Sequence, residues 1–320
     1  MTEEFLLQVR NVGLSDERGF ALRNISFSQQ QGQHVVIAGE TGSGKSTLLK
    51  IIAGLAQPQT GSVLFEGEPV KGPRETLVPG HPAIAYLPQY FDLPKFLRVE
   101  QVLEYASKIT PREADRIFRL CKIRQLLNRK TDELSGGERQ RIALCRLLIG
   151  KPVLLLLDEP YTNLDMIVKG TLKEVIQSIS HQLGITTLLV SHDPEETLPW
   201  ADHILILKGG KLVQQGSPEE IYFEPRNEYV AGLFGRYSVI SQRLHRAMGG
   251  AGSGKAIIRP EQLVIRKGRS KSGVPGTVIV QKFAGHGYEI TVDLKGTAVS
   301  CVSADSTLGA GTTVTLRLRM

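Results

Sequence analysis

The chain has 320 residues, of which 41% are hydrophobic, 22% charged and 6% aromatic, a composition that excludes a disordered or fibrous protein. The length exceeds what one compact core usually fills, so we expect one large domain and a smaller second one. The net charge of +7 is uneven, because residues 1–235 hold 26 Lys and Arg against 28 Asp and Glu, a balance of −2, whereas residues 236–320 hold 13 against 4, a balance of +9.

The basic last quarter of the chain has four interpretations. Its surface could face acidic lipid headgroups, an anionic ligand or RNA, or it could keep a small domain soluble, and we favour the last of these. The longest purely aliphatic run, Val153–Leu157, is far shorter than the roughly 18 to 20 residues of a membrane-spanning helix. The start of the chain is acidic, unlike a secretory signal, so we expect a cytosolic protein.

Three cysteines, Cys121, Cys145 and Cys301, lie far apart and form no CxxC pair. This spacing suggests neither a disulfide framework nor a zinc site. We therefore predict three buried free thiols.

The pattern of the first 55 residues predicts two antiparallel strands and then a strand–loop–helix unit. Apolar and polar residues alternate over 5–9 and over 25–27, which predicts antiparallel strands. Residues 34–38 form a short, continuous apolar strand that leads into a glycine-rich loop, and residues 46–55 have helical spacing.

Further along, short apolar strands alternate with helices. The predicted strands are 153–157, 187–191 and 203–207, and a helix is predicted over 166–183. The order predicts an α/β fold with a mostly parallel sheet that has helices on both faces. Helical spacing between 100 and 128, with Pro111 opening the second helix, indicates an inserted helical lobe over about 92–135.

The segment from Gly39 to Ser46 fits the phosphate-binding loop pattern, and it lies between an apolar strand and a helix as that pattern requires. Its glycines let backbone N–H groups turn inward around a phosphate at a helix N-terminus. We expect Lys45 to reach the β- and γ-phosphates of ATP and Ser46 to ligate Mg²⁺. The predicted ATP-binding residues are Gly39, Glu40, Thr41, Gly42, Ser43, Gly44, Lys45, Ser46 and Thr47.

A second match to the loop pattern, over 249–255, fails. Ala256 stands in place of the magnesium-binding hydroxyl, and no apolar strand precedes the match. We interpret this stretch as part of a linker.

Residues Leu154–Leu157 form an apolar strand, and two carboxylates, Asp158 and Glu159, follow directly at its end. We expect Asp158 to hold Mg²⁺ through water, and Glu159 to orient and partly deprotonate the water that attacks the phosphate. Two acids in an ordinary strand-end turn are the alternative when this stretch is taken alone.

The sequence Leu134-Ser-Gly-Gly-Glu138 opens a helix that Ser135 can cap, and its glycines let the backbone approach an anion. Together with the phosphate-binding loop and the paired acids, it makes residues 1–235 resemble the ATP-binding-cassette (ABC) ATPases, whose signature loop has this sequence. Within that resemblance, Gln89 looks like the Q-loop, Asp165 like the D-loop aspartate and His192 like the switch histidine.

The resemblance implies that two cassettes sandwich two ATP molecules. His192 would contact the γ-phosphate, and Gln89 would sense Mg²⁺ and the transport subunit through the helical lobe. The family also stacks an aromatic on adenine; Phe20 is the nearest candidate, with core packing beside Phe27 as the alternative. The implied site residues are, for catalysis, Lys45, Gln89, Glu159 and His192; for Mg²⁺, Ser46, Gln89 and Asp158; and for the partner's ATP, Leu134, Ser135, Gly136, Gly137 and Glu138.

A second resemblance covers the end of the chain. Ile258-Arg-Pro-Glu261, followed by alternating strands over 290–294 and 314–318, looks like the start of the TOBE domain of prokaryotic importer ATPases. We expect an ABC ATPase domain over 1–235, a linker over 236–256 and an OB-like β-barrel over 257–320, and we favour a packing or dimerisation role for the barrel.

Together the resemblances imply the ATP-hydrolysing subunit of a prokaryotic ABC importer, with ATP and Mg²⁺ as cofactors. It would act as a homodimer on the cytoplasmic face of the membrane, beneath two permease subunits and served by an extracytoplasmic solute-binding protein. The alternatives are a soluble ABC ATPase acting on RNA or ribosomes, and an exporter ATPase. Residues 255–320 contain only Phe283 and Tyr288 for stacking on bases, so we expect no nucleic-acid partner.

Overall fold

The computed structural model describes residues 5–15, 19, 21–90, 92–251, 254–270, 272–285 and 287–319. The chain divides into two compact units, Met1–Pro218 and Glu219–Met320. Each unit has a hydrophobic core of its own. Among the described helices, none combines the length and the apolar character needed to cross a membrane.

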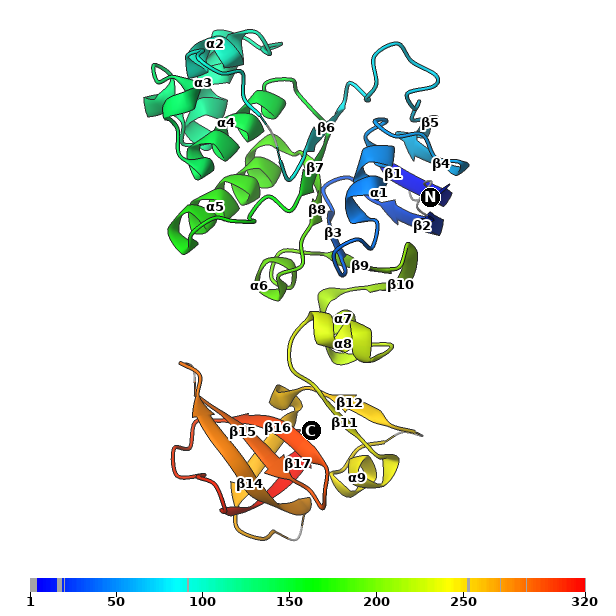
Figure 1. Ribbon diagram of the computed structural model, residues 1–320, viewed down its shortest axis with the longest axis vertical. Helices are drawn as coiled ribbons and strands as arrows, with labels where there is room; N and C mark the ends of the chain where they lie inside the picture. The colour runs from blue at the N-terminus through cyan, green and yellow to red at the C-terminus, as the bar shows by residue number, and fades with distance from the viewer. Residues whose placement is uncertain are drawn as a thin grey trace. The chain divides into compact units, whose positions relative to one another are not determined.

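The first unit is built on a six-stranded sheet with the order β10-β9-β3-β8-β7-β6 (Figure 1). Its strands are β3 (His34–Ala38), β6 (Ile84–Leu87), β7 (Leu154–Asp158), β8 (Thr186–Val190), β9 (His203–Lys208) and β10 (Lys211–Gly216). The strands from β9 to β6 pair in parallel, and β10 pairs antiparallel with β9. Every residue of β7 and β8 is buried, as expected of strands covered on both faces. The predicted parallel sheet is confirmed.

A four-stranded antiparallel sheet with the order β2-β1-β4-β5 completes one side of this unit. Its strands are β1 (Leu7–Ser15), β2 (Ala21–Gln29), β4 (Thr60–Phe65) and β5 (Glu68–Pro69). Helix α1 (Lys45–Ile52) packs between the two sheets, where its Leu48 and Ile52 join Phe27 and Leu156 in one core. The strands predicted from alternation near the N-terminus are therefore confirmed.

Helices cover the opposite side of the six-stranded sheet, where Figure 1 shows α4 and α5 beside β6, β7 and β8. The helices of this part of the unit are α2 (Val99–Glu104), α3 (Pro111–Leu120), α4 (Gly136–Leu148), α5 (Met166–Leu183) and α6 (Pro194–Thr197), with 3₁₀ turns at Arg124–Leu126 and Thr131–Glu133. Helices α2 and α3 pack on α4, and α3 also packs on α5. Pro111 opens α3 as predicted, and Thr110 caps it by accepting a hydrogen bond from the Glu113 amide. Cys121 and Cys145 are buried here, and Cys301 is buried in the second unit.

The second unit contains a five-stranded antiparallel sheet with the order β13-β17-β14-β15-β16. Its elements are α7 (Pro218–Phe223), α8 (Glu228–Leu233), β11 (Ser238–Ile240), α9 (Gln242–Ala247), β12 (Ala256–Ile258), a 3₁₀ turn at Pro260–Gln262, β13 (Leu263–Lys267), β14 (Val274–Phe283), β15 (Tyr288–Asp293), β16 (Ala298–Ser303) and β17 (Thr313–Leu318). The edge strands β13 and β16 also approach each other, so the sheet curls into a half-barrel. This shape agrees with the OB-like fold expected of the end of the chain.

The segment 236–256 differs from the linker predicted over it. Strand β11 pairs with β12, α9 lies between them, and Ile240 and Met248 are buried in the core of the second unit. The second unit also begins at Glu219 rather than after residue 235, so it includes α8. The glycine-rich run after Met248 indicated a flexible connection, whereas the burial of Ile240 and Met248 depends on a sheet formed by residues far along the chain.

Arg259 joins α7 and α8 to the half-barrel. It is 1% exposed, and its Nε donates to the carbonyl of Tyr222 at 2.9 Å. Its Nη1 donates to the carbonyls of Ala231, Gly235 and Arg236 at 2.9, 3.2 and 3.2 Å. The guanidinium carbon lies 4.3 Å from the centre of the Tyr222 ring. A single planar cation thus satisfies carbonyls near the ends of two helices, where negative partial charge accumulates.

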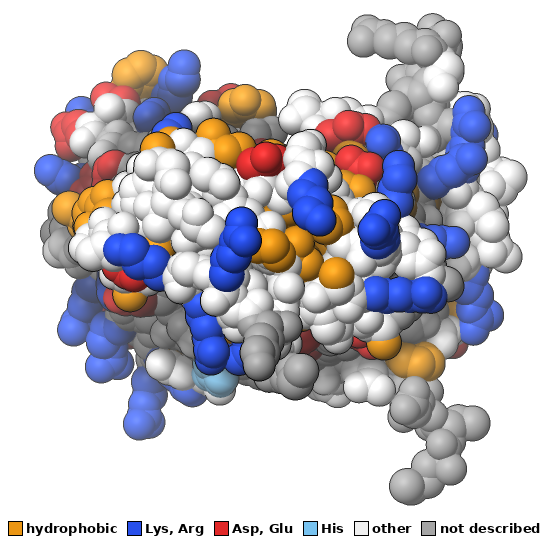
Figure 2. All heavy atoms as spheres, turned by 90° about the horizontal axis from the view of Figure 1, so that it is seen from below, with side chains coloured by type: hydrophobic (Ala, Val, Ile, Leu, Met, Phe, Trp, Pro, Cys, Tyr) orange, Lys and Arg blue, Asp and Glu red, His pale blue; other side chains and the backbone are white. Residues whose placement is uncertain are grey.

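The Lys and Arg side chains on the face shown in Figure 2 are dispersed. Figure 2 views the molecule from below and shows Lys and Arg side chains spread over the face, with uncharged side chains between them. Dispersed like charges favour solubility, which is the interpretation we preferred for the balance of +9.

We expect Arg259→Lys to lower the unfolding temperature of the C-terminal unit and its free energy of unfolding by about 2–3 kcal/mol, because lysine has no planar fork to reach all these carbonyls. Scanning calorimetry of the full chain measures the change. The control is Arg266→Lys, an exposed position on β13. Equal shifts in the two variants would contradict the role assigned to Arg259.

Candidate functional site

The loop between β3 and α1 has a backbone that requires glycine. Gly39, Gly42 and Gly44 have φ values of 151°, 80° and 103°. A Cβ on Gly39 would lie 2.2 Å from the carbonyl oxygen of Leu207, so no other residue fits there. This turn leaves α1 beginning at Lys45, with its N-terminal amides at the mouth of the loop.

Lys45 lies over the loop. Its Nζ donates to the carbonyls of Gly39 at 2.8 Å and Glu40 at 2.9 Å. Burial lowers the pKa of Lys45, and the nearby Glu159, Asp158 and Glu40 carboxylates act against that change. The ammonium is therefore held among anionic groups at the position where the loop would receive phosphate.

Asp158, at the end of β7, accepts two side-chain hydrogen bonds. Ser46 Oγ donates to its Oδ1 at 3.1 Å, and Tyr86 Oη donates to its Oδ2 at 2.9 Å. Burial raises the pKa of Asp158, as does the neighbouring Glu159, while both hydrogen bonds and Lys45 oppose the rise. Burial and Asp158 together raise the pKa of Tyr86. A hydroxyl and a carboxylate side by side are oxygen ligands that suit Mg²⁺.

Tyr86 was not among the predicted site residues. It lies three residues before Gln89, and the pairing of β6 with β7 brings it beside Asp158. The only pattern that could have suggested it is a tyrosine near the end of a strand that precedes a predicted site residue.

The Glu159 carboxylate is contacted by side chains from three other segments or turns of the site. Its φ is 47°, a left-handed conformation that is costly for a non-glycine residue and concentrated at functional sites. Gln89 Nε2 and Thr162 Oγ1 donate to its Oε2 at 3.1 and 3.2 Å. His192 Nδ1 lies 3.5 Å from its Oε1. The structure thus brings together Gln89, Glu159 and His192, and adds Thr162, which the sequence did not suggest.

A pocket of about 330 Å³ joins the phosphate-binding loop to these groups. It is lined by Thr41, Gly42, Gly44, Lys45, Ser46, Thr47, Gln89 and Glu159. Backbone amides, an ammonium, a hydroxyl and a carboxylate therefore face one space, as a triphosphate with Mg²⁺ requires. Ser43 is buried against Gly39, and the candidate Phe20 lies outside the described residues.

The predicted signature loop lies elsewhere in the first unit, at the start of α4. Ser135 Oγ accepts from the Glu138 amide at 3.2 Å, and Glu138 Oε2 accepts from the Ser135 amide at 2.9 Å, which forms a capping box. The predicted cap is confirmed. A Cβ on Gly137 would lie 2.1 Å from a methyl carbon of Val168 on α5, so any other residue there would force the Val168 side chain to move. Among the described residues that line the pocket with Lys45, none belongs to residues 134–138.

Asp165 caps α5. Its Oδ1 accepts from the amides of Ile167 at 3.1 Å and Val168 at 2.9 Å. Asn163, two residues earlier, has a φ of 62°. The segment between Glu159 and α5 is therefore a tight turn whose geometry is set by the start of the helix.

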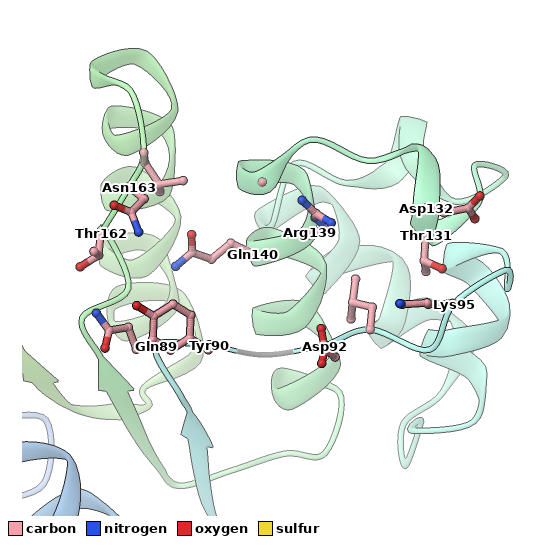
Figure 3. A pocket seen from close by; sticks show the side chains of 13 residues that line it. Gln89, Tyr90, Asp92, Lys95, Thr131, Asp132, Arg139, Gln140, Thr162 and Asn163 are labelled. Carbon is pink, nitrogen blue, oxygen red and sulfur yellow. The ribbon is translucent and has the colours of Figure 1, made fainter.

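A larger pocket of about 700 Å³ opens between the Gln89 segment and the helical lobe (Figure 3). Gln140, from α4, points toward Thr162 and Asn163 in Figure 3, and it donates a hydrogen bond to the Pro160 carbonyl. Tyr90 also lines the pocket, and 79% of it is exposed. This pocket therefore contacts both the Gln89 segment and the turn that follows Glu159.

Comparisons with known proteins agree with this geometry. The ABC transporter family matches residues 22–162, and the TOBE domain family matches residues 256–320. A spermidine/putrescine import ATP-binding protein of Mycoplasma mycoides is 33% identical over 91% of this chain and 89% of its own length. A molybdate/tungstate import ATP-binding protein of Thermococcus kodakarensis is 34% identical over 82% and 84%.

A solved structure with the same fold is a dimeric ATP-binding cassette, MJ0796, in a post-hydrolysis state with ADP and phosphate bound. The TM-score is 0.58 at 25% identity, and the match covers 66% of this chain and 98% of that one. The fold and its order of elements thus belong to a known class.

We expect Tyr86→Phe to raise the pKa of Asp158, because the substitution removes a hydrogen bond that stabilises the charged carboxylate. Carbon-13 NMR titration of the Asp158 carboxyl group measures the shift. The matched control is Tyr90→Phe, at an exposed position. An unchanged pKa in Tyr86→Phe would show that the hydrogen bond does not act on Asp158.

Proposed function

The chain belongs to the ABC transporter family of ATP-binding subunits, and we propose that it hydrolyses ATP with Mg²⁺ to drive a prokaryotic importer. The observation that carries this proposal is the single pocket shared by Lys45, Ser46, Gln89 and Glu159. It joins a phosphate cradle, a candidate metal ligand and a candidate base in one space.

In the proposed reaction each residue acts at a stated atom. The amides of the loop and Lys45 Nζ bind the β- and γ-phosphates, and Ser46 Oγ and Asp158 hold Mg²⁺ with Gln89. When bound, Mg²⁺ offsets the negative charge of the phosphates. Glu159 accepts a proton from the attacking water, and His192 contacts the γ-phosphate from the neighbouring loop. Gln89 and Thr162 orient the Glu159 carboxylate by donating to its Oε2.

The active form in this proposal is a homodimer. The signature loop lies outside the pocket of its own chain, and its capped helix start presents backbone amides to an anion. A second copy could therefore place Ser135 and Gly137 against the nucleotide held by the first. The MJ0796 cassette is named as dimeric, which supports the same arrangement here.

Two membrane permease subunits are the proposed partners at the cytoplasmic face of the membrane, with an extracytoplasmic protein that delivers the solute. The pocket of Figure 3 suits the permease contact, because it combines exposed Tyr90 with Gln89, which touches Glu159. The two relatives are named for the import of different solutes: one for the polyamines spermidine and putrescine, which are cations, and the other for the oxyanions molybdate and tungstate. The transported solute is therefore set by the partners, because the proposed cycle does not pass it through this chain.

Glu159→Gln should retain ATP binding and lower kcat for hydrolysis by about 10²–10⁴-fold, because the amide cannot accept the proton of the water. A phosphate-release assay and equilibrium nucleotide binding measure the two effects. Glu195→Gln, an exposed acid on α6, is the control and should hydrolyse ATP normally. Normal turnover in Glu159→Gln would remove Glu159 as the base.

Tyr90→Ala should reduce the amount of the chain that co-purifies in detergent with the permease proteins encoded beside it, while the basal ATPase rate stays the same. The loss follows from removing an exposed aromatic side chain from the docking pocket. Tyr105→Ala is the control, because Tyr105 is 81% exposed at the end of α2 and does not line that pocket.

The importer assignment itself is tested by co-expression of the unaltered chain with those membrane proteins. Hydrolysis stimulated by the solute-binding protein supports import. A soluble, RNA-stimulated enzyme without a membrane partner would contradict it.

A further inference from the structure

A cluster of three charged side chains lies beside the site and outside the predicted machinery. Lys169, in the first turn of α5, places its Nζ 2.6 Å from Asp193 Oδ2 and 2.5 Å from Glu196 Oε1. The side chains of these three residues are 18%, 29% and 8% exposed. Because the Glu196 carboxylate is largely out of water, it needs a cation, and Lys169 supplies it.

The cluster encloses the backbone of His192. On one side of the histidine, Ser191 Oγ donates to Glu196, and the Asp193 amide donates to Ser191 Oγ at 3.1 Å. On the other side, Asp193 Oδ1 accepts from the Glu195 amide at 2.9 Å and caps α6. The residues that precede and follow His192 are therefore both bound, directly or through Glu196, to Lys169.

The His192 side chain itself is held more loosely. It is 63% exposed, and its Nδ1 lies 3.5 Å from Glu159 Oε1. Its position relative to Glu159 therefore depends mainly on its backbone. A pocket of about 350 Å³ is lined by Glu159, His192 and Lys169 together, so the charged cluster and the candidate catalytic pair face a common space.

The same lysine is linked to the turn before α5. The Lys169 amide donates to the carbonyl of Asp165 at 2.8 Å, and the Asp165 side chain caps the helix. A shift of the first turn of α5 would therefore move the Lys169 ammonium and the two carboxylates that it binds. Although burial alone would lower the pKa of Lys169, the hydrogen bonds that its ammonium donates to Asp193 and Glu196 raise it, so the cation persists at neutral pH.

We propose that Lys169 is a positioning residue for His192: its ion pairs with Asp193 and Glu196 hold the histidine loop in register with Glu159 and join that loop to the start of α5. This inference deepens the proposed function and rests on it. Lys169 contacts neither the phosphate-binding loop nor Glu159 in any described hydrogen bond or ion pair, so its effect on hydrolysis acts through His192.

The test compares three variants of the full chain. Lys169→Met removes the charge at similar length, and we expect kcat to fall between about tenfold and about 100-fold while KM for ATP changes less than about twofold. Lys169→Arg keeps both ion pairs and should restore most of kcat. Lys173→Met is the matched control one turn further along α5, where Nζ lies over the Tyr161 ring, donates to the Glu195 carbonyl at 3.5 Å and binds neither carboxylate in the described contacts.

Two further measurements separate positioning from general stability. In a His192→Ala background, Lys169→Met should cause little additional loss of kcat, because the residue through which it acts is already gone. Hydrogen–deuterium exchange of the nucleotide-free protein should be faster over residues 190–197 in Lys169→Met than in the unaltered chain or in Lys173→Met, which loses only the long contact with the Glu195 carbonyl. If Lys169→Met does not fold, Lys169→Met/Glu196→Gln removes the more buried of the two unpaired carboxylates and takes its place.

Failure of this inference is distinguishable from failure of the proposed function. If the unaltered chain hydrolyses ATP but Lys169→Met matches it in kcat and in exchange, the positioning role is wrong. Equal losses of kcat in the presence and absence of His192 also overturn it. If the unaltered chain does not hydrolyse ATP in the assembled complex, the proposed function fails first, and the exchange experiment alone then decides whether Lys169 orders the loop.

Discussion

The parallel pairing of β3, β7 and β8 is the constraint on which the site depends. Parallel strands end at the same edge of a sheet, so the phosphate-binding loop after β3, the paired acids after β7 and the histidine after β8 converge there. Two backbone hydrogen bonds extend this alignment past the strands: the Ser191 amide donates to Ile37, and the Glu159 amide donates to Val190. Three segments far apart in the sequence thus meet without any direct contact being required between their side chains.

The site contains backbone conformations and a buried charge that are unfavourable, and the packing of the surrounding strands offsets their cost. Glu159 and Asn163 adopt left-handed backbones, and Asp158 is a buried carboxylate whose pKa is raised by burial. Such features are unfavourable individually, and the buried strands β7 and β8 compensate for them. The rigid sheet also explains why flexible side chains such as His192 need a positioning cluster, because they stand on loops beyond the strands.

The C-terminal unit is held together differently from the first unit, because a buried cation contributes to its packing. Its core is small, and its helices α7 and α8 rest on a buried guanidinium that satisfies several carbonyls at once. The arginine of the Ile258-Arg-Pro-Glu261 segment therefore has a structural role, because Arg259 binds these carbonyls without any ligand. On the face shown in Figure 2 the Lys and Arg side chains stand apart from one another, an arrangement that favours solubility.

The sequence by itself determined the order of elements and most of the site. The glycines of 39–44, the acids at 158 and 159 and the cap at Ser135 are local patterns, because the conformation of each depends on a few neighbouring residues. Only the tertiary structure decided that Tyr86 binds Asp158, that Lys169 binds Asp193 and Glu196, and that 238–248 belongs to the second core. These contacts join segments many residues apart, and no periodicity along the chain encodes which distant side chains become neighbours once the sheets form.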